Sequence, residues 1–153
     1  MKKQILFTVL LSLCIFFIQA QQPELAYPGE RHLKNIRQLT FGGDNAEAYW
    51  SFDGRMVSFQ SNNKAWGVQC DQIFFTPVDA QTNLKEEKPK MVSTGKGRST
   101  CAYFMPGDKR ILFGSTHLGG DACPAEPERV PGGKYLWPIY DTYDIFVSDL
   151  NGK

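Results

Sequence analysis

Side chains with functional groups suited to binding or catalysis are concentrated in one segment of the sequence, between about His117 and Trp137. The segment combines an imidazole, carboxylates, a thiol, a guanidinium and aromatic rings with three prolines, and a fourth, Pro138, follows it. Proline lowers the entropy that a loop loses on ordering, and Trp, Tyr and Arg most often anchor binding surfaces. We therefore expect a binding loop here, and its candidate contact residues are His117, Asp121, Arg129, Tyr135 and Trp137. The alternative is a loop that packs only as a structural cover.

Catalytic signatures are absent from the sequence. It contains no Gly-x-Ser-x-Gly elbow and no His-Glu-x-x-His motif, and its only histidines are His32 and His117. The segment 95–100 has the glycines of a phosphate-binding loop but lacks the Gly-Lys-Ser/Thr ending. His117 and Asp121 could ligate a metal, but the stronger reading of both is structural or binding. We predict no catalytic residue, no metal and no cofactor in this chain, which would be non-catalytic by itself.

Composition narrows the function classes further. The 153 residues carry 17 Lys+Arg against 16 Asp+Glu, so the charge is near zero and gives no basis for binding nucleic acid. A hydrophobic content of 42% excludes general disorder. The length allows one domain at most, or a piece of a larger one.

The first twenty residues have the features of a cleavable signal peptide. Lys2 and Lys3 form a basic start, an apolar run covers 5–18, and Ala20 offers a small residue for cleavage. The apolar run is shorter than the ~18–20 residues that span a bilayer. We expect a periplasmic or secreted protein with no membrane span in the mature chain; the alternative is an uncleaved anchor.

The rest of the sequence contains an internal repeat. The segment 48–61 aligns without a gap on 102–115, at an offset of 54 residues. The Ile-Phe pair at Ile73 recurs at Ile145, at an offset of 72, so the second copy carries an insertion. Short aromatic and β-branched runs bounded by Gly, Asp and Pro predict strands throughout.

The repeat predicts an all-β fold. The expected strands are 47–51, 56–61, 72–78 and 90–93 in the first copy, and 101–105, 110–115 and 143–149 in the second. The segment 36–41 matches the fourth-strand position before any first strand. Tandem four-stranded antiparallel units are typical of a partial β-propeller of about two blades, in the order D-ABCD-ABC. A β-sandwich built from the same hairpins is the alternative.

Three cysteines remain after the signal peptide. An odd number in an exported chain predicts one disulfide and one thiol, because the spacings do not fit a zinc site. In an up-and-down blade the B–C and D–A loops leave at the same end. This places Cys70, Cys101 and Cys123 at one end and favours the pair Cys70–Cys101, with Cys101–Cys123 as the alternative.

The repeat motifs resemble those of the TolB-like (WD-like) β-propellers of exported bacterial proteins. The similar segments are 37–43 (Arg-Gln-Leu-Thr-Phe-Gly-Gly), 48–54 (Ala-Tyr-Trp-Ser-Phe-Asp-Gly) and 71–74 (Asp-Gln-Ile-Phe). Two departures stand out: Phe52 replaces the usual proline, and the second copy reads Pro106-Gly107-Asp108 with its last two residues transposed. The resemblance spans about 36–153.

The resemblance implies a domain organisation and a role. We expect a signal peptide at 1–20, a linker at 21–35 and an incomplete propeller at 36–153, with repeats at about 36–93 and 94–153. Two blades cannot close a ring of ~4–8, so further blades of the same polypeptide are expected as partners. The implied role is a scaffold that binds a protein or small ligand in the cell envelope. The alternative is the propeller domain of a secreted peptidase or amidohydrolase whose catalytic part lies beyond Lys153.

Four repeated residues are interpreted as structural. Asp71 and Asp144 precede the Ile-Phe pairs of the third strands, where an aspartate commonly bonds a neighbouring turn. Trp50 and Phe104 lie at equivalent positions, and alternation along the strand predicts that both belong to the core.

Overall fold

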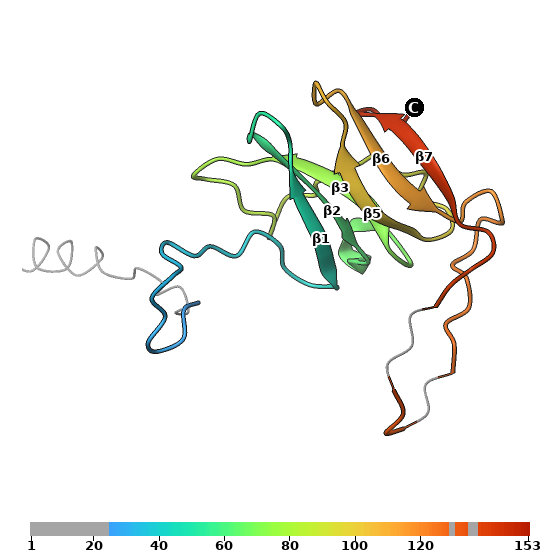
Figure 1. Ribbon diagram of the computed structural model, residues 1–153, viewed down its shortest axis with the longest axis horizontal. Helices are drawn as coiled ribbons and strands as arrows, with labels where there is room; N and C mark the ends of the chain where they lie inside the picture. Colours follow the sequence, from blue (N-terminus) through green and yellow to red (C-terminus); the bar gives the residue numbers. More distant parts are fainter. Residues whose placement is uncertain (1–24, 129–130, 135–137) are drawn as a thin grey trace, which may run out of the picture. The chain divides into compact units, whose positions relative to one another are not determined.

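The computed structural model describes residues 25–128, 131–134 and 138–153 (Figure 1). The chain divides into two compact units, one ending at Arg37 and one spanning Gln38–Lys153. The second unit holds every strand of the described residues. Its elements are β1 (Asn45–Trp50), β2 (Met56–Ser61), the 3-10 helix η2 (Lys64–Trp66), β3 (Gln72–Pro77), β4 (Lys90–Met91), β5 (Ser99–Phe104), β6 (Arg110–Ser115) and β7 (Asp144–Asp149).

The described part of the first unit is organised around Glu30. The Glu30 N–H donates to the Tyr27 carbonyl oxygen at 3.1 Å, and its carboxylate accepts from the N–H groups of His32 and Leu33 at 2.6 and 3.1 Å. These hydrogen bonds to the ionised form lower the pKa of Glu30. Across both units, no helix in the described residues is long and apolar enough to cross a membrane.

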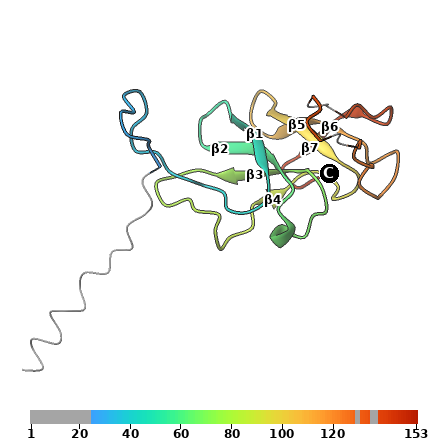
Figure 2. The ribbon, with the colours of Figure 1, turned by 90° about the horizontal axis from the view of Figure 1, so that it is seen from below.

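The second unit consists of two antiparallel sheets, as Figure 2 shows from below. Sheet 1 has the order β1-β2-β3-β4, and sheet 2 has the order β5-β6-β7. Neighbours in each sheet are also neighbours in sequence, so every connection is an up-and-down one. The prediction of an all-β chain built from antiparallel sheets is therefore confirmed.

The two sheets reproduce the sequence repeat residue by residue. β5 and β6 begin 54 residues after β1 and β2, and β7 begins 72 residues after β3. The register is conserved as well, since Trp50 pairs with Val57 in sheet 1 and Phe104 pairs with Ile111 in sheet 2. Both first strands carry an irregularity at the same place, where Glu47 and Cys101 have φ angles of 53° and 54°. One structural module is thus present twice.

The expected strand at 36–41 does not form. These residues adopt no ladder in the structure, and the Leu39 carbonyl oxygen instead accepts a hydrogen bond from the Leu84 N–H at 2.9 Å. The fourth strand of the first copy is also shorter than predicted, covering only Lys90–Met91. The segment 36–41 has no partner strand in register, and beyond Met91 the Ile73 N–H donates to the Ser93 hydroxyl oxygen at 2.9 Å instead of to a backbone carbonyl.

The core lies between the sheets. Buried residues from β3, β5 and β6 form it together with Val92, and its members are Ile73, Phe75, Val92, Ala102, Phe104, Ile111 and Phe113. A second cluster covers the other face of sheet 1, and its members are Val57, Phe59, Trp66, Val68, Phe74 and Leu84. Within sheet 1, β2 and β3 are therefore buried on both faces, whereas β1 is largely exposed and sheet 2 buries the face that meets sheet 1.

Equivalent aromatic residues of the two copies have different environments. Phe104 is 0% exposed in the core between the sheets, as predicted. Trp50, predicted as a core residue on the same grounds, is 56% exposed. The prediction for Trp50 is wrong because sheet 1 covers the inner face of sheet 2, and no described element covers Trp50 in the same way.

The transposed turn of the second copy links the two sheets. Asp108 has a φ of 56° at the position that Gly54 occupies in the first copy, with a φ of 70°. The Asp108 carboxylate accepts hydrogen bonds from the N–H groups of Phe52 and Asp53, at 2.8 and 3.0 Å. Aspartate tolerates this left-handed conformation better than most residues. The Gly-Asp order in the second copy, where the first copy has Asp-Gly, thus places a carboxylate that links the β1–β2 and β5–β6 turns.

We expect the Asp108→Asn variant to lower the free energy of unfolding by about 1 kcal/mol, because an amide offers one acceptor oxygen and no charge to the two N–H donors. Urea denaturation checks this result. Asp141→Asn, at an exposed position, is the control and should unfold like the wild type. Equal stability of all three proteins would show that this link contributes nothing.

Candidate binding surface at the long-loop end

Three connections of the two sheets, with the longest (116–143) among them, leave at one end of the second unit, and the β3–β4 connection (78–89) leaves at the other. We call the first of these the long-loop end; it comprises the β2–β3 connection (62–71), the β4–β5 connection (92–98) and the described residues of the β6–β7 connection (116–143). Backbone hydrogen bonds join them there, from Ser99 N–H to Asp71 O at 2.8 Å and from Gly97 N–H to Asp121 O at 3.0 Å. The antiparallel strand order therefore places segments far apart in sequence side by side.

The disulfide of the structure joins Cys70 to Cys123, with the Cα atoms 6.0 Å apart. The favoured pairing of Cys70 with Cys101, and the alternative of Cys101 with Cys123, are both corrected by this finding. Cys101 is free and exposed. It lies within β5, where its N–H donates to Gln60 Oε1 at 3.2 Å, and not in the connection before the strand. The two bonded cysteines both belong to long connections, one from each sheet.

An ion-pair cluster lies beside the disulfide. Arg98 contacts Asp71, with Nε 3.5 Å from a carboxylate oxygen, and its Nη2 bonds a carboxylate oxygen of Glu126. The Arg98 and Asp71 side chains are largely buried, whereas that of Glu126 is about half exposed. Burial raises the pKa of Asp71, and the charge of Arg98 opposes this rise. Arg98 thus links Glu126 in the β6–β7 connection to Asp71 at the end of the β2–β3 connection.

The side-chain amide of Gln72 forms three hydrogen bonds with the β4–β5 connection. Its Oε1 accepts from the Ser93 hydroxyl at 2.7 Å and from the Gly95 N–H at 3.1 Å, and its Nε2 donates to the Gly97 carbonyl oxygen at 2.8 Å. Gln72 is 1% exposed, so the satisfied amide fixes the loop that carries Arg98. A polar residue at the start of a strand gave no sequence signal for this role.

Two of the five predicted contact residues, His117 and Asp121, lie within the described residues, and each has a different partner. His117 packs its ring on Phe146, with centroids 4.3 Å apart, and its Nδ1 lies 3.0 Å from Ser115 Oγ. Asp121 is exposed and pairs instead with Lys96 at 2.9 Å. The other three predicted residues, Arg129, Tyr135 and Trp137, lie outside the described residues. No group of three or more metal-ligating side chains occurs within the described ranges.

Other residues of the β6–β7 connection have the exposure of a contact surface. Leu118 and Ile139 are 72% and 92% exposed, which are among the largest exposed fractions of the large apolar side chains in the described residues. The Tyr140 hydroxyl donates to the Ala125 carbonyl oxygen at 2.9 Å and so bridges the two limbs of the connection. Sequence reasoning favoured the charged and aromatic residues here and missed the two aliphatic ones.

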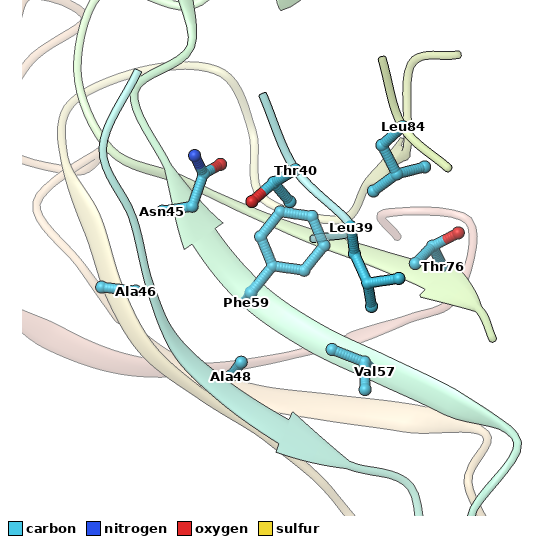
Figure 3. Close-up of a pocket in the computed structure, with 9 residues that line it drawn as sticks. All are labelled: Leu39, Thr40, Asn45, Ala46, Ala48, Val57, Phe59, Thr76 and Leu84. Atoms are coloured by element: carbon cyan, nitrogen blue, oxygen red, sulfur yellow. The ribbon is translucent and has the colours of Figure 1, made fainter. Parts of the chain in front are cut away.

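A hollow of about 140 Å³ lies on the face of sheet 1 that points away from sheet 2 (Figure 3). Its walls are mostly apolar, and the lining residues are Leu39, Thr40, Asn45, Ala46, Ala48, Val57, Phe59, Thr76 and Leu84. A hollow of this size takes one small apolar group, such as a benzene-sized ring. It contains no charged side chain, so it offers nothing for acid–base chemistry.

Comparison of the chain with protein-family models, with curated proteins and with solved structures gives no match. The class of protein that the geometry defines is an all-β chain with a duplicated antiparallel module. Nothing in these comparisons assigns it to a family.

Gly97 supports the long-loop end through a close backbone approach. Its φ is 56°, and a Cβ placed on it would lie 2.7 Å from Thr116 Oγ1 and 2.9 Å from the His117 nitrogen. Gly43, at the equivalent place in the first copy, has a φ of 66° and would meet the Asn63 Cα at 2.6 Å. The repeat therefore conserves a glycine where two backbones touch.

We expect Gly97→Ala to lower the free energy of unfolding by about 2–3 kcal/mol, because left-handed strain and the crowding both act. Gly54→Ala is the matched control, since its φ is 70° but a Cβ there meets nothing within 4 Å. Thermal unfolding of both variants measures the difference. Equal losses would mean that the close contact relaxes without cost.

Proposed function

We propose that this chain is an exported, non-catalytic β-propeller segment of the TolB-like kind that binds a protein or ligand in the periplasm or cell envelope. The observation that carries the proposal is the duplicated module, whose two copies have the same strand order and so bring the β2–β3, β4–β5 and β6–β7 connections to one end. Consecutive blades of a propeller repeat in this manner. The segments 37–43, 48–54 and 71–74 support the family, and the Cys70–Cys123 disulfide fits an oxidising compartment.

The β6–β7 connection is the proposed contact surface. Its base is fixed by the disulfide, by the Arg98–Glu126 ion pair and by the Tyr140–Ala125 hydrogen bond. The same connection exposes the apolar side chains of Leu118 and Ile139, near its two ends. The candidates Arg129, Tyr135 and Trp137 belong to the same connection, and aromatic and arginine side chains are the usual anchors of such contacts.

The test removes the outer part of this connection. A deletion of 119–134 would also remove Cys123, so the sharper variant replaces 127–139 with two glycines and keeps Cys123, Glu126 and Tyr140. Chemical crosslinking in envelope extracts of the native host, read by mass spectrometry, should recover a partner with the wild type and lose it with the deletion.

The control variant is Lys109→Glu, which changes an exposed charge on the β5–β6 turn at the opposite end. We expect it to recover the same partner as the wild type. Recovery of that partner by the correctly folded deletion variant would refute the proposed surface.

A further inference from the structure

Three aromatic side chains form an exposed group beside the first strands of the two sheets. We call this group the aromatic patch; its members are Tyr49 of β1, Phe52 of the turn after β1, and Tyr103 of β5. The Tyr103 ring centroid lies 5.6 Å from that of Tyr49 and 6.2 Å from that of Phe52, with interplanar angles of 64° and 85°. Tyr49, Phe52 and Tyr103 are 39%, 59% and 49% exposed. Edge-to-face contacts therefore hold the rings in place while part of each ring faces solvent.

The repeat shows that neighbouring modules leave these rings exposed. Tyr49 and Tyr103 are equivalent residues, 54 positions apart. Tyr49 is exposed although a second module follows its own in the chain, and Tyr103 is exposed although a module precedes its own. Phe52 corresponds to Pro106, which is likewise exposed with sheet 1 before it. Neither a preceding nor a following module thus covers the positions that form the patch.

A carboxylate lies at the edge of the aromatic patch. The Tyr49 hydroxyl donates to Glu47 Oε2 at 2.7 Å. This hydrogen bond and the charge of Glu47 raise the pKa of the Tyr49 hydroxyl, so the ring is uncharged at neutral pH. Glu47 takes part in none of the ion pairs formed by the described residues. Its carboxylate is therefore available to a cation from outside the chain.

The ring faces and the carboxylate together favour one kind of ligand. The face of an aromatic ring attracts a cation that lies within about 6 Å of its centroid. In the part of the chain that the structure describes, Lys90 lies in this way over Phe75, at 5.8 Å, and no cation lies over a ring of the aromatic patch. A guanidinium is planar and more weakly hydrated than an ammonium, so it can stack on a ring while it bonds a carboxylate.

We propose that the aromatic patch and Glu47 bind an arginine side chain of a partner polypeptide. The guanidinium stacks on the tyrosine rings and donates to the Glu47 carboxylate, and the arginine methylenes cover apolar ring area. None of the connections of the long-loop end contributes to this site. The proposal therefore does not depend on the function proposed for that end.

The probe is a capped peptide with one central arginine between alanines, added to the ¹⁵N-labelled full chain. We expect chemical-shift changes centred on the amides of 47–53 and 101–104. The same peptide with citrulline, which has nearly the shape of arginine without its charge, should bind about tenfold more weakly, because the attraction to the rings and to Glu47 is lost. Changes centred elsewhere, no change at millimolar peptide, or equal binding of the citrulline peptide would overturn the proposal.

Variants of the chain test the ring and the carboxylate separately. Tyr103→Leu should bind the arginine peptide about tenfold more weakly, whereas Tyr103→Phe keeps the ring and should bind within about threefold of the wild type. Glu47→Gln keeps an acceptor for the Tyr49 hydroxyl but removes the charge, and we expect binding about fivefold weaker. The urea midpoint of each variant shows that it is folded. Wild-type binding by a folded Tyr103→Leu or Glu47→Gln protein would also overturn the proposal.

Discussion

Replacing both Cys70 and Cys123 with serine is expected to lower the free energy of unfolding by about 4 kcal/mol. The bridged cysteines are 53 residues apart, and the chain-entropy relation gives this value for a loop of that length. The loss is large against the ~5–15 kcal/mol by which a domain is stable. It should appear as a lower urea midpoint in non-reducing buffer. We expect the same shift when the wild type is unfolded in the presence of a reductant.

Cys101→Ser is the matched control for the disulfide. Cys101 is free and exposed, so its replacement should change the stability by less than about 0.5 kcal/mol. Peptide mapping under non-reducing conditions should find Cys70 linked to Cys123 and Cys101 open to alkylation. A linked peptide containing Cys101, or an unchanged urea midpoint for the double serine variant, would contradict the assignment.

Phe104→Ala is expected to cost about 3–5 kcal/mol, the usual range for truncating a buried phenylalanine. Phe104 is 0% exposed, and its ring contacts that of Phe75 edge-on across the two sheets, at 6.4 Å between centroids. The truncation leaves a cavity where sheet 2 packs on sheet 1. Urea denaturation followed by circular dichroism measures the loss.

Trp50→Ala is the control that the repeat itself supplies. Trp50 has the same strand position and pairing as Phe104 but is 56% exposed, so we expect a loss of less than about 1 kcal/mol. The pair of variants separates the effect of burial from the effect of strand position. Similar losses for the two would show that the outer face of sheet 1 is covered in solution.

The strand positions of this protein could be predicted from sequence almost completely. β2 and β6 match their expected bounds, and β1, β3, β5 and β7 match within two residues. Alternating apolar residues and Asp-Gly turns are local signals, and their recurrence at a fixed offset strengthens each of them. The segment 36–41 was predicted wrongly because a lone strand has no ladder to complete, whatever its propensity.

The candidate site could be predicted only in part. The sequence predicted that the insertion leaves at the same end as the β2–β3 and β4–β5 connections. It did not identify the roles of Arg98 and Gln72 or the exposure of Leu118 and Ile139. Arg98 gains its role from Asp71 and Glu126, which come from two other connections. Residues that depend on partners far away in the chain carry no local pattern that would reveal them.

The sequence by itself determined that one antiparallel module occurs twice, because turn chemistry and side-chain alternation act within a few residues. Only the tertiary structure decided how the modules use equivalent positions. It buried Phe104 and exposed Trp50, paired Cys70 with Cys123, and placed the Asp108 carboxylate on the neighbouring turn. These outcomes depend on which face of one sheet meets the other, and that contact joins residues far apart in the sequence.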